Sequence, residues 1–142
     1  MITMDANPPF VPPVGPTQAA SPSRSWEVMC HLSALVAWLG MPFGNLIGPF
    51  VVWIIKRGDS PSIDAHGREV LNFQLSWTLY IFAFAAMTVV LMFILIGFLM
   101  LPFLIAACLI GPVISLILSI IGAVKAGNGE LFHYPLTIRF LR

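Results

Sequence analysis

Two long stretches of the chain carry no charged side chain. Residues 28–55 and 70–124 contain no Asp, Glu, Lys or Arg, which gives charge-free runs of 28 and 55 residues. An α-helix needs about 20 apolar residues to cross a bilayer core about 30 Å thick, and both runs exceed that length. Only 9% of the residues are charged, whereas a soluble domain usually carries about 25%. The sequence therefore predicts an all-α integral membrane protein that is embedded in the lipid bilayer.

The bulk charge and the cysteines exclude several classes of protein. A net charge of +1 provides no field that would capture a polyanion, so we expect no nucleic-acid partner. Cys30 and Cys108 stand alone in apolar segments, without a C-x-x-C spacing, so neither a zinc site nor a disulfide framework is indicated. We expect no cofactor.

The N-terminal part divides into a tail and a broken apolar run. Residues 1–25 hold six of the twelve prolines and are predicted to form a disordered tail. Residues 26–55 are interrupted at positions 41–45, where Met-Pro-Phe-Gly-Asn separates two apolar segments about 22 and 15 Å long as helices. Each is shorter than a bilayer core, so the run forms a broken crossing, two spans, or a hairpin that enters the membrane and returns.

The basic residues favour the hairpin. If residues 26–55 return to the side they left, all seven basic residues lie on one face of the membrane, as the positive-inside rule prefers. They are Arg24, Lys56, Arg57, Arg68, Lys125, Arg139 and Arg142. A single crossing would leave Arg24 on the opposite side. We therefore expect both termini on the cytoplasmic side of a bacterial inner membrane.

Two long helices follow the hairpin. The first is predicted from Pro61 to Ile96, with Ser60 as its N-cap and Pro61 at its first position, and Gly67 could allow a bend. A turn near residues 97–102 then leads to a second helix over residues 103–126. The predicted fold is a bundle of about four helices over residues 26–126, with a short first pair and two long spans. Residues 127–142 are expected to form a cytoplasmic tail at the membrane interface.

Small side chains recur along the last helix every four residues and mark a packing face. They are Gly111, Ser115, Ser119, Ala123 and Gly127. Small residues let two membrane helices approach closely. The preceding helix carries a matching face with Asn72, Ser76 and Ala83, and we expect Asn72 and Ser76 to form hydrogen bonds across the interface. Pro112 predicts a kink, which in a transport protein would line a path.

Titratable side chains gather at the predicted cytoplasmic end. They are Glu27, His31, Asp64, His66, Glu69 and His133. Two histidines and two glutamates could hold a metal, but their spacing is loose and no H-E-x-x-H sequence is present. Rather than a metal site, we expect ion pairs with one another and with lipid headgroups among Asp64, His66, Arg68 and Glu69. The charge-free runs also lack the intramembrane acids and bases of an ion-coupled pump.

Two segments of the sequence resemble a known family. The first segment is the string His66-Gly-Arg-Glu-Val-Leu-Asn-Phe-Gln74, together with Gly48-Pro49 and Trp53-Ile-Ile-Lys56 that precede it. The second segment runs from Lys125 through Tyr134-Pro135 to Phe140. They resemble small bacterial membrane proteins of unknown function that are similar to the twenty-kilodalton subunit of the chloroplast inner-envelope protein-import translocon. The resemblance covers residues 26–142. It implies a four-helix membrane bundle and a role in or beside a protein-translocation assembly.

These observations predict a non-enzymatic, multi-pass membrane protein that acts through helix association, as a homo-oligomer or as an accessory subunit of a membrane assembly. The resemblance suggests a docking collar at the cytoplasmic end, made of His66, Arg68, Glu69, Asn72, Gly129, Glu130, Tyr134 and Pro135. One alternative is a small channel or carrier, with Pro112 and an aromatic stripe along its path. The other is an enzyme at the membrane interface that uses Glu27, His31, His66 and Glu69 to bind a metal.

Overall fold

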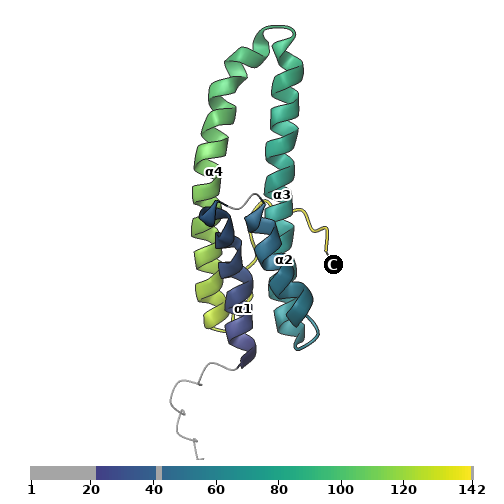
Figure 1. The fold of residues 1–142 in the computed structure, drawn as a ribbon, viewed down its shortest axis with the longest axis vertical. Helices are drawn as coiled ribbons and strands as arrows, with labels where there is room; N and C mark the ends of the chain where they lie inside the picture. The colour runs from purple at the N-terminus through teal and green to yellow at the C-terminus, as the bar shows by residue number, and fades with distance from the viewer. Residues whose placement is uncertain (1–21, 41–42, 142) are drawn as a thin grey trace, which may run out of the picture.

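The structure of the protein is a computed structural model that describes residues 22–40 and 43–141. The elements are α1 (Pro22–Leu32), the 3-10 helix η1 (Ser33–Leu39), α2 (Gly44–Lys56), α3 (Pro61–Met92) and α4 (Ile96–Gly127). The described part of the chain is helical and holds no strand, so the predicted all-α bundle is confirmed. Figure 1 shows α3 and α4 as a long antiparallel hairpin, with the short helices packed against one half of it.

The short helices form the predicted hairpin. Gly44 and Gly48 of α2 lie directly against η1: a Cβ on Gly44 would be 2.7 Å from the Ala37 backbone nitrogen, and one on Gly48 would be 2.0 Å from the Ser33 carbonyl oxygen. The chain therefore turns back between η1 and α2, at the interruption in the apolar run. Residues 41–42 lie outside the described residues.

The boundary of the predicted tail is wrong at its C-terminal side. Residues 1–21 lie outside the described part of the chain, but residues 22–25 already belong to α1. Pro22 is the first residue of that helix, where a proline costs nothing because the first backbone N–H groups have no partner in the helix.

The predicted start of α3 is confirmed. The Ser60 hydroxyl accepts a hydrogen bond from the Ser62 backbone N–H at 3.2 Å, and Pro61 occupies the first turn. α3 continues as a helix through Gly67. A Cβ at Gly67 would lie 2.2 Å from Cδ1 of Trp53, so this glycine admits the indole of α2.

The predicted turn at residues 97–102 is wrong. α3 ends at Met92, α4 begins at Ile96, and Leu95 between them has a φ of 64°. Gly97 is helical and packs against the end of α3, where its Cβ would lie 2.4 Å from the Thr88 carbonyl oxygen. Pro102 lies inside α4. Proline and glycine are weaker helix breakers in membrane helices, because neighbouring groups can satisfy the freed backbone atoms.

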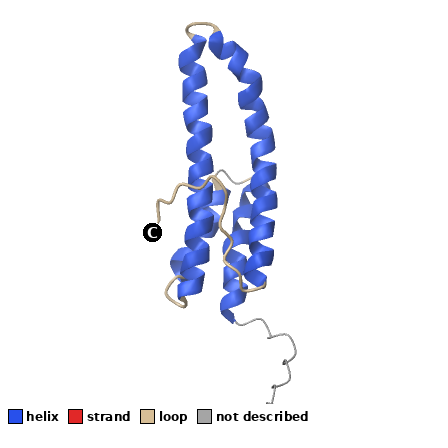
Figure 2. Cartoon of the chain, turned by 180° about the vertical axis from the view of Figure 1, so that it is seen from behind, coloured by secondary structure: helices blue, strands red, loops and turns tan. Residues whose placement is uncertain are grey.

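After α4, the chain runs back along α3 (Figure 2). The Asn72 side chain accepts hydrogen bonds from the backbone N–H groups of Phe140 and Leu141 at 3.0 and 2.8 Å, and donates one to the Leu141 carbonyl oxygen at 3.0 Å. Ser76 Oγ accepts one from the Ile138 N–H at 2.7 Å. The segment predicted as an interfacial tail is thus tied to the bundle by side chains of α3.

Both long helices have the length and composition of membrane spans. Each has 32 residues, and their most apolar windows have mean hydropathies of 1.9 and 2.7. At 1.5 Å per residue each is about 48 Å long. Large apolar side chains point outward along both, among them Phe82, Met87, Phe98, Phe103 and Leu109. In water such a surface would be costly, whereas lipid is its natural solvent.

Candidate functional site

A chain of buried polar side chains joins α1, α3 and the C-terminal segment. His31 Nδ1 lies 2.7 Å from the Tyr134 hydroxyl, and His31 Nε2 lies 3.0 Å from His66 Nδ1. His66 Nε2 lies 3.9 Å from a carboxylate oxygen of Glu27. All four side chains are buried, and we call them the histidine–tyrosine cluster.

One arrangement of protons satisfies the whole histidine–tyrosine cluster. The Tyr134 hydroxyl donates to His31 Nδ1, which leaves the His31 Nε2–H to donate to His66 Nδ1. The His66 Nε2–H then faces the Glu27 carboxylate. Both imidazoles are neutral in this arrangement, which we infer from the hydrogen-bond geometry.

Burial keeps the His31 imidazole and the Tyr134 hydroxyl uncharged. It lowers the pKa of His31 to about 3, with a smaller contribution from His66, and raises the pKa of Tyr134. Gly122 makes room for the cluster, since a Cβ there would lie 2.5 Å from His31 Nδ1. Burial also raises the pKa of the neighbouring Cys30 thiol to about 12, so this cysteine is not an activated nucleophile.

The four residues of the metal-site hypothesis do not converge. Glu27, His31 and His66 lie in the cluster, but Glu69 faces the C-terminal segment, 3.0 Å from His133 Nδ1 and 3.2 Å from an Arg139 nitrogen. In the described residues, no group of three or more His, Cys, Asp or Glu side chains could hold a metal ion. The expected ion pairing is seen between Arg68 and Asp64, one helical turn apart.

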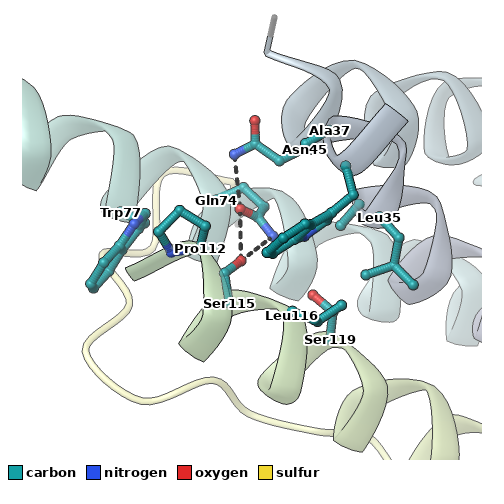
Figure 3. Close-up of a pocket in the computed structure, with 11 residues that line it drawn as sticks. Leu35, Ala37, Asn45, Gln74, Trp77, Pro112, Ser115, Leu116 and Ser119 are labelled. Carbon is teal, nitrogen blue, oxygen red and sulfur yellow. Dashed lines mark hydrogen bonds between the residues drawn. The ribbon is translucent and has the colours of Figure 1, made fainter. Parts of the chain in front are cut away.

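A second polar feature lies deeper in the bundle, between η1, α2, α3 and α4 (Figure 3). It is a cavity of about 180 Å³ crossed by hydrogen bonds from Asn45 Nδ2 to Gln74 Oε1 at 3.0 Å and from Gln74 Nε2 to Ser115 Oγ at 3.1 Å. Ser119 also lines it, and its hydroxyl is buried without a hydrogen bond of good geometry. Ser119 lies near enough to Tyr134 to affect the pKa of its hydroxyl, but that hydroxyl forms its hydrogen bond with His31. We call this the polar cavity.

The small residues of α4 lie between helices of the same chain. Gly111 meets Trp77 of α3, whose Cζ2 would lie 2.2 Å from a Cβ there. Ser115 binds Gln74 of α3, and Ser119 and Ala123 are buried. At the end of α4, a Cβ on Gly127 would be 3.8 Å from Val28 of α1. The packing face of small residues on α4 therefore faces α3 at one end and α1 at the other.

The partner face expected on α3 is wrong in two respects. Asn72 and Ser76 bind the C-terminal segment rather than α4, and Ala83 is exposed. Gln74 forms the hydrogen bond between the two long helices instead. The sequence does indicate this contact, because a polar amide within a charge-free run needs a partner inside the protein.

The residues predicted as a docking collar do not form one surface. His66, Glu69, Asn72 and Tyr134 are buried. Gly129, Glu130 and Pro135 are exposed, and Arg68 is half-buried. The buried members of the set hold the C-terminal segment and the cluster together, so they cannot contact a docked partner directly.

Comparison with known proteins corrects the resemblance drawn from the sequence. No curated protein and no solved structure matches the chain. The family model that matches describes the magnetosome magnetite crystal formation proteins, MamF and MmsF, and covers residues 22–141. The resemblance to the translocon subunit is therefore wrong, and the translocation role that it implied has no support. Because the match covers most of its length, the chain belongs to the MamF/MmsF magnetosome magnetite crystal formation family.

Proposed function

We propose that this chain is a multi-pass protein of the magnetosome membrane that serves magnetite crystal formation without catalysing a reaction. It acts through association of its helices with a second copy or with other membrane proteins. The family supports the process, and the two long apolar helices support the membrane location.

The charged groups favour one orientation. α1 and α3 begin, and α2 and α4 end, at the same end of the bundle (Figure 1), and Arg24, Lys56, Arg68 and Lys125 belong to these helix ends. The positive-inside rule assigns this end to the cytoplasm. From Arg68 to Phe93 the helix rises about 38 Å, so the turn between α3 and α4 reaches the lumenal face of the membrane.

The composition of that turn carries the proposal. Phe93, Ile94 and Leu95 are 88%, 60% and 76% exposed, and no Asp, Glu or His occurs between residues 70 and 124. Iron is bound in proteins by carboxylate, imidazole and thiolate ligands. The turn therefore offers no group that would bind iron or the crystal, and we infer that the protein acts on crystal formation through its neighbours in the membrane.

Replacement of residues 93–95 by Ser-Gly-Ser tests this inference. We expect magnetite crystals of unchanged number and size in electron micrographs of a magnetosome-forming host, because the turn does not contact the mineral. The matched variant, Phe103→Ala with Leu109→Ala, removes apolar side chains from the outer face of α4. We expect it to lower the yield of cross-linked neighbours and to give smaller crystals.

Both variants need a check of their abundance in the membrane by immunoblot. If the 93–95 replacement abolishes crystals while the protein stays in the membrane, the turn acts directly and the proposal is wrong. A strictly monomeric protein without any cross-linked neighbour would contradict it as well.

The polar cavity supports a second candidate, a carrier for a small neutral solute. Its lining offers amides and hydroxyls but no charge, and Pro112 and Trp77 form part of its wall. A charged solute would lose its hydration there without a counter-charge, so ions are disfavoured. In liposomes, we expect glycerol flux above the protein-free rate and a lower flux for Ser119→Val; flux equal to the protein-free rate would exclude the carrier.

A further inference from the structure

The outer faces of α2 and α3 enclose an apolar groove. It has a volume of about 320 Å³ and is lined by Leu46, Ile47 and Phe50 of α2 and by Leu71 and Leu75 of α3, with Trp53 and Leu141 also in its wall. Leu71 is buried and forms part of the floor, whereas Ile47 and Phe50 are about half exposed and form a wall. The groove is open to the surroundings of the bundle.

A basic hollow adjoins the groove at the charged end of the bundle. It is lined by Arg57, Arg68 and Asp64, and it shares Trp53 and Leu141 with the groove. The shared indole is held in place, because Trp53 Nε1 donates a hydrogen bond to the Asp64 carboxylate at 2.8 Å. The two hollows therefore form one continuous surface.

Both helices arrange their side chains in the same order along this surface. On α2, residues 46, 50, 53 and 57 share one face, since their spacing follows the helical repeat. They are Leu, Phe, Trp and Arg in that order. On α3, Arg68, Leu71 and Leu75 share a face in the same way. Leu46 and Trp53 lie about 10 Å apart along the axis, and Arg57 follows one turn later.

The charge of the hollow is unbalanced. Arg68 is paired with Asp64. The Arg57 guanidinium lies 4.9 Å from the centre of the Trp53 ring, and no described carboxylate forms an ion pair with it. Two arginines and one aspartate leave a local charge of +1, which suits a ligand with a single negative charge.

We propose that this surface binds one anionic phospholipid, with its phosphate at Arg57 and Arg68 and one acyl chain in the groove between α2 and α3. A cation at the charged end, followed by apolar side chains toward the middle of the bundle, reproduces the order of a phospholipid in a leaflet. Guanidinium groups suit phosphate because they present two parallel donors. The site requires the membrane location but not the association function proposed above, so either can fail alone.

Native mass spectrometry of the full chain, released from micelles that contain equal amounts of phosphatidylglycerol and phosphatidylcholine, tests the site. We expect one phosphatidylglycerol to be retained in preference to phosphatidylcholine. Arg57→Gln should lower that retention about tenfold, as expected for loss of one charge-assisted contact. The matched control is Arg24→Gln, which removes a cation beside Gly129, away from the groove, and should leave retention unchanged.

A second variant tests the groove separately. Leu75→Trp fills it while both arginines remain, and we expect it to lower retention of the lipid as well. Equal retention by Arg57→Gln and Arg24→Gln would overturn the proposal. Displacement of the lipid by inorganic phosphate, together with no effect of Leu75→Trp, would show a phosphate site only. Unchanged thermal unfolding of each variant confirms that lost retention is not lost folding.

Discussion

Gly48→Ala is expected to lower the free energy of unfolding by about 3 kcal/mol, the upper end of the usual range for overpacking. The new Cβ would lie 2.0 Å from the Ser33 carbonyl oxygen and 2.8 Å from the Ser33 carbonyl carbon. These are backbone atoms, so no side chain can rotate away to relieve the contact. The first helical pair must separate, and the Asn45–Gln74 hydrogen bond at the polar cavity would be strained with it.

The measurement is chemical unfolding of the purified full chain in detergent, followed by far-ultraviolet circular dichroism. Gly58→Ala is the matched control, because a Cβ at Gly58 meets no atom within 4 Å and its φ is not positive. We expect that variant to stay within about 0.5 kcal/mol of the parent. Equal stability of the two variants would show that α2 and η1 do not approach as closely as described.

The arrangement of the helices could be predicted because bilayer thickness and charge act on long segments. The interruption before Gly44 marks the reversal of the short pair, and Ser60-Pro61 carries the capping chemistry of α3. Charge-free length gives the two long helices. The predicted turn between them is wrong because Gly97 and Pro102, which break helices in water, are both part of α4.

The contacts of the polar groups could not be predicted in the same way. His31 and His66 are 35 residues apart, and His31 and Tyr134 are 103 residues apart, so no local pattern joins them. Asn72 presents a polar side chain at the helix surface, and helix periodicity does not say whether α4 or a returning tail will meet it. Such contacts depend on how the helices are rotated and on the path of the C-terminal segment.

Glycines illustrate the same limit. The sequence predicts a bend at Gly67 and indicates no role for Gly48 beyond its place in the Gly48-Pro49 motif. In the structure both are sites of close approach, to Trp53 and to the Ser33 backbone. A single sequence does not distinguish a glycine that is needed for flexibility from one that is needed for space.

Acidification from pH 7.5 to pH 5 is expected to destabilise the fold through His31. Burial holds the pKa of this imidazole at about 3 in the folded protein, against 6.5 for an ordinary histidine. The unfolded chain therefore binds a proton below pH 6.5 that the folded chain does not bind. The contribution of the neutral His31 imidazole to the free energy of unfolding is complete above pH 6.5 and is lost progressively as the pH falls toward 3. At pH 5 the loss is about 2 kcal/mol.

The loss should be specific to His31, although carboxylates also titrate in acid. We expect His31→Gln to unfold with a smaller difference between pH 7.5 and pH 5 than the parent, because the variant has no buried imidazole to protonate. His133→Gln is the matched control: its side chain is 59% exposed, and the parent's pH dependence should persist in it. An unchanged difference in His31→Gln would mean that protonation of the cluster does not oppose folding. A reduced difference would show that protonation of the buried His31 imidazole opposes folding.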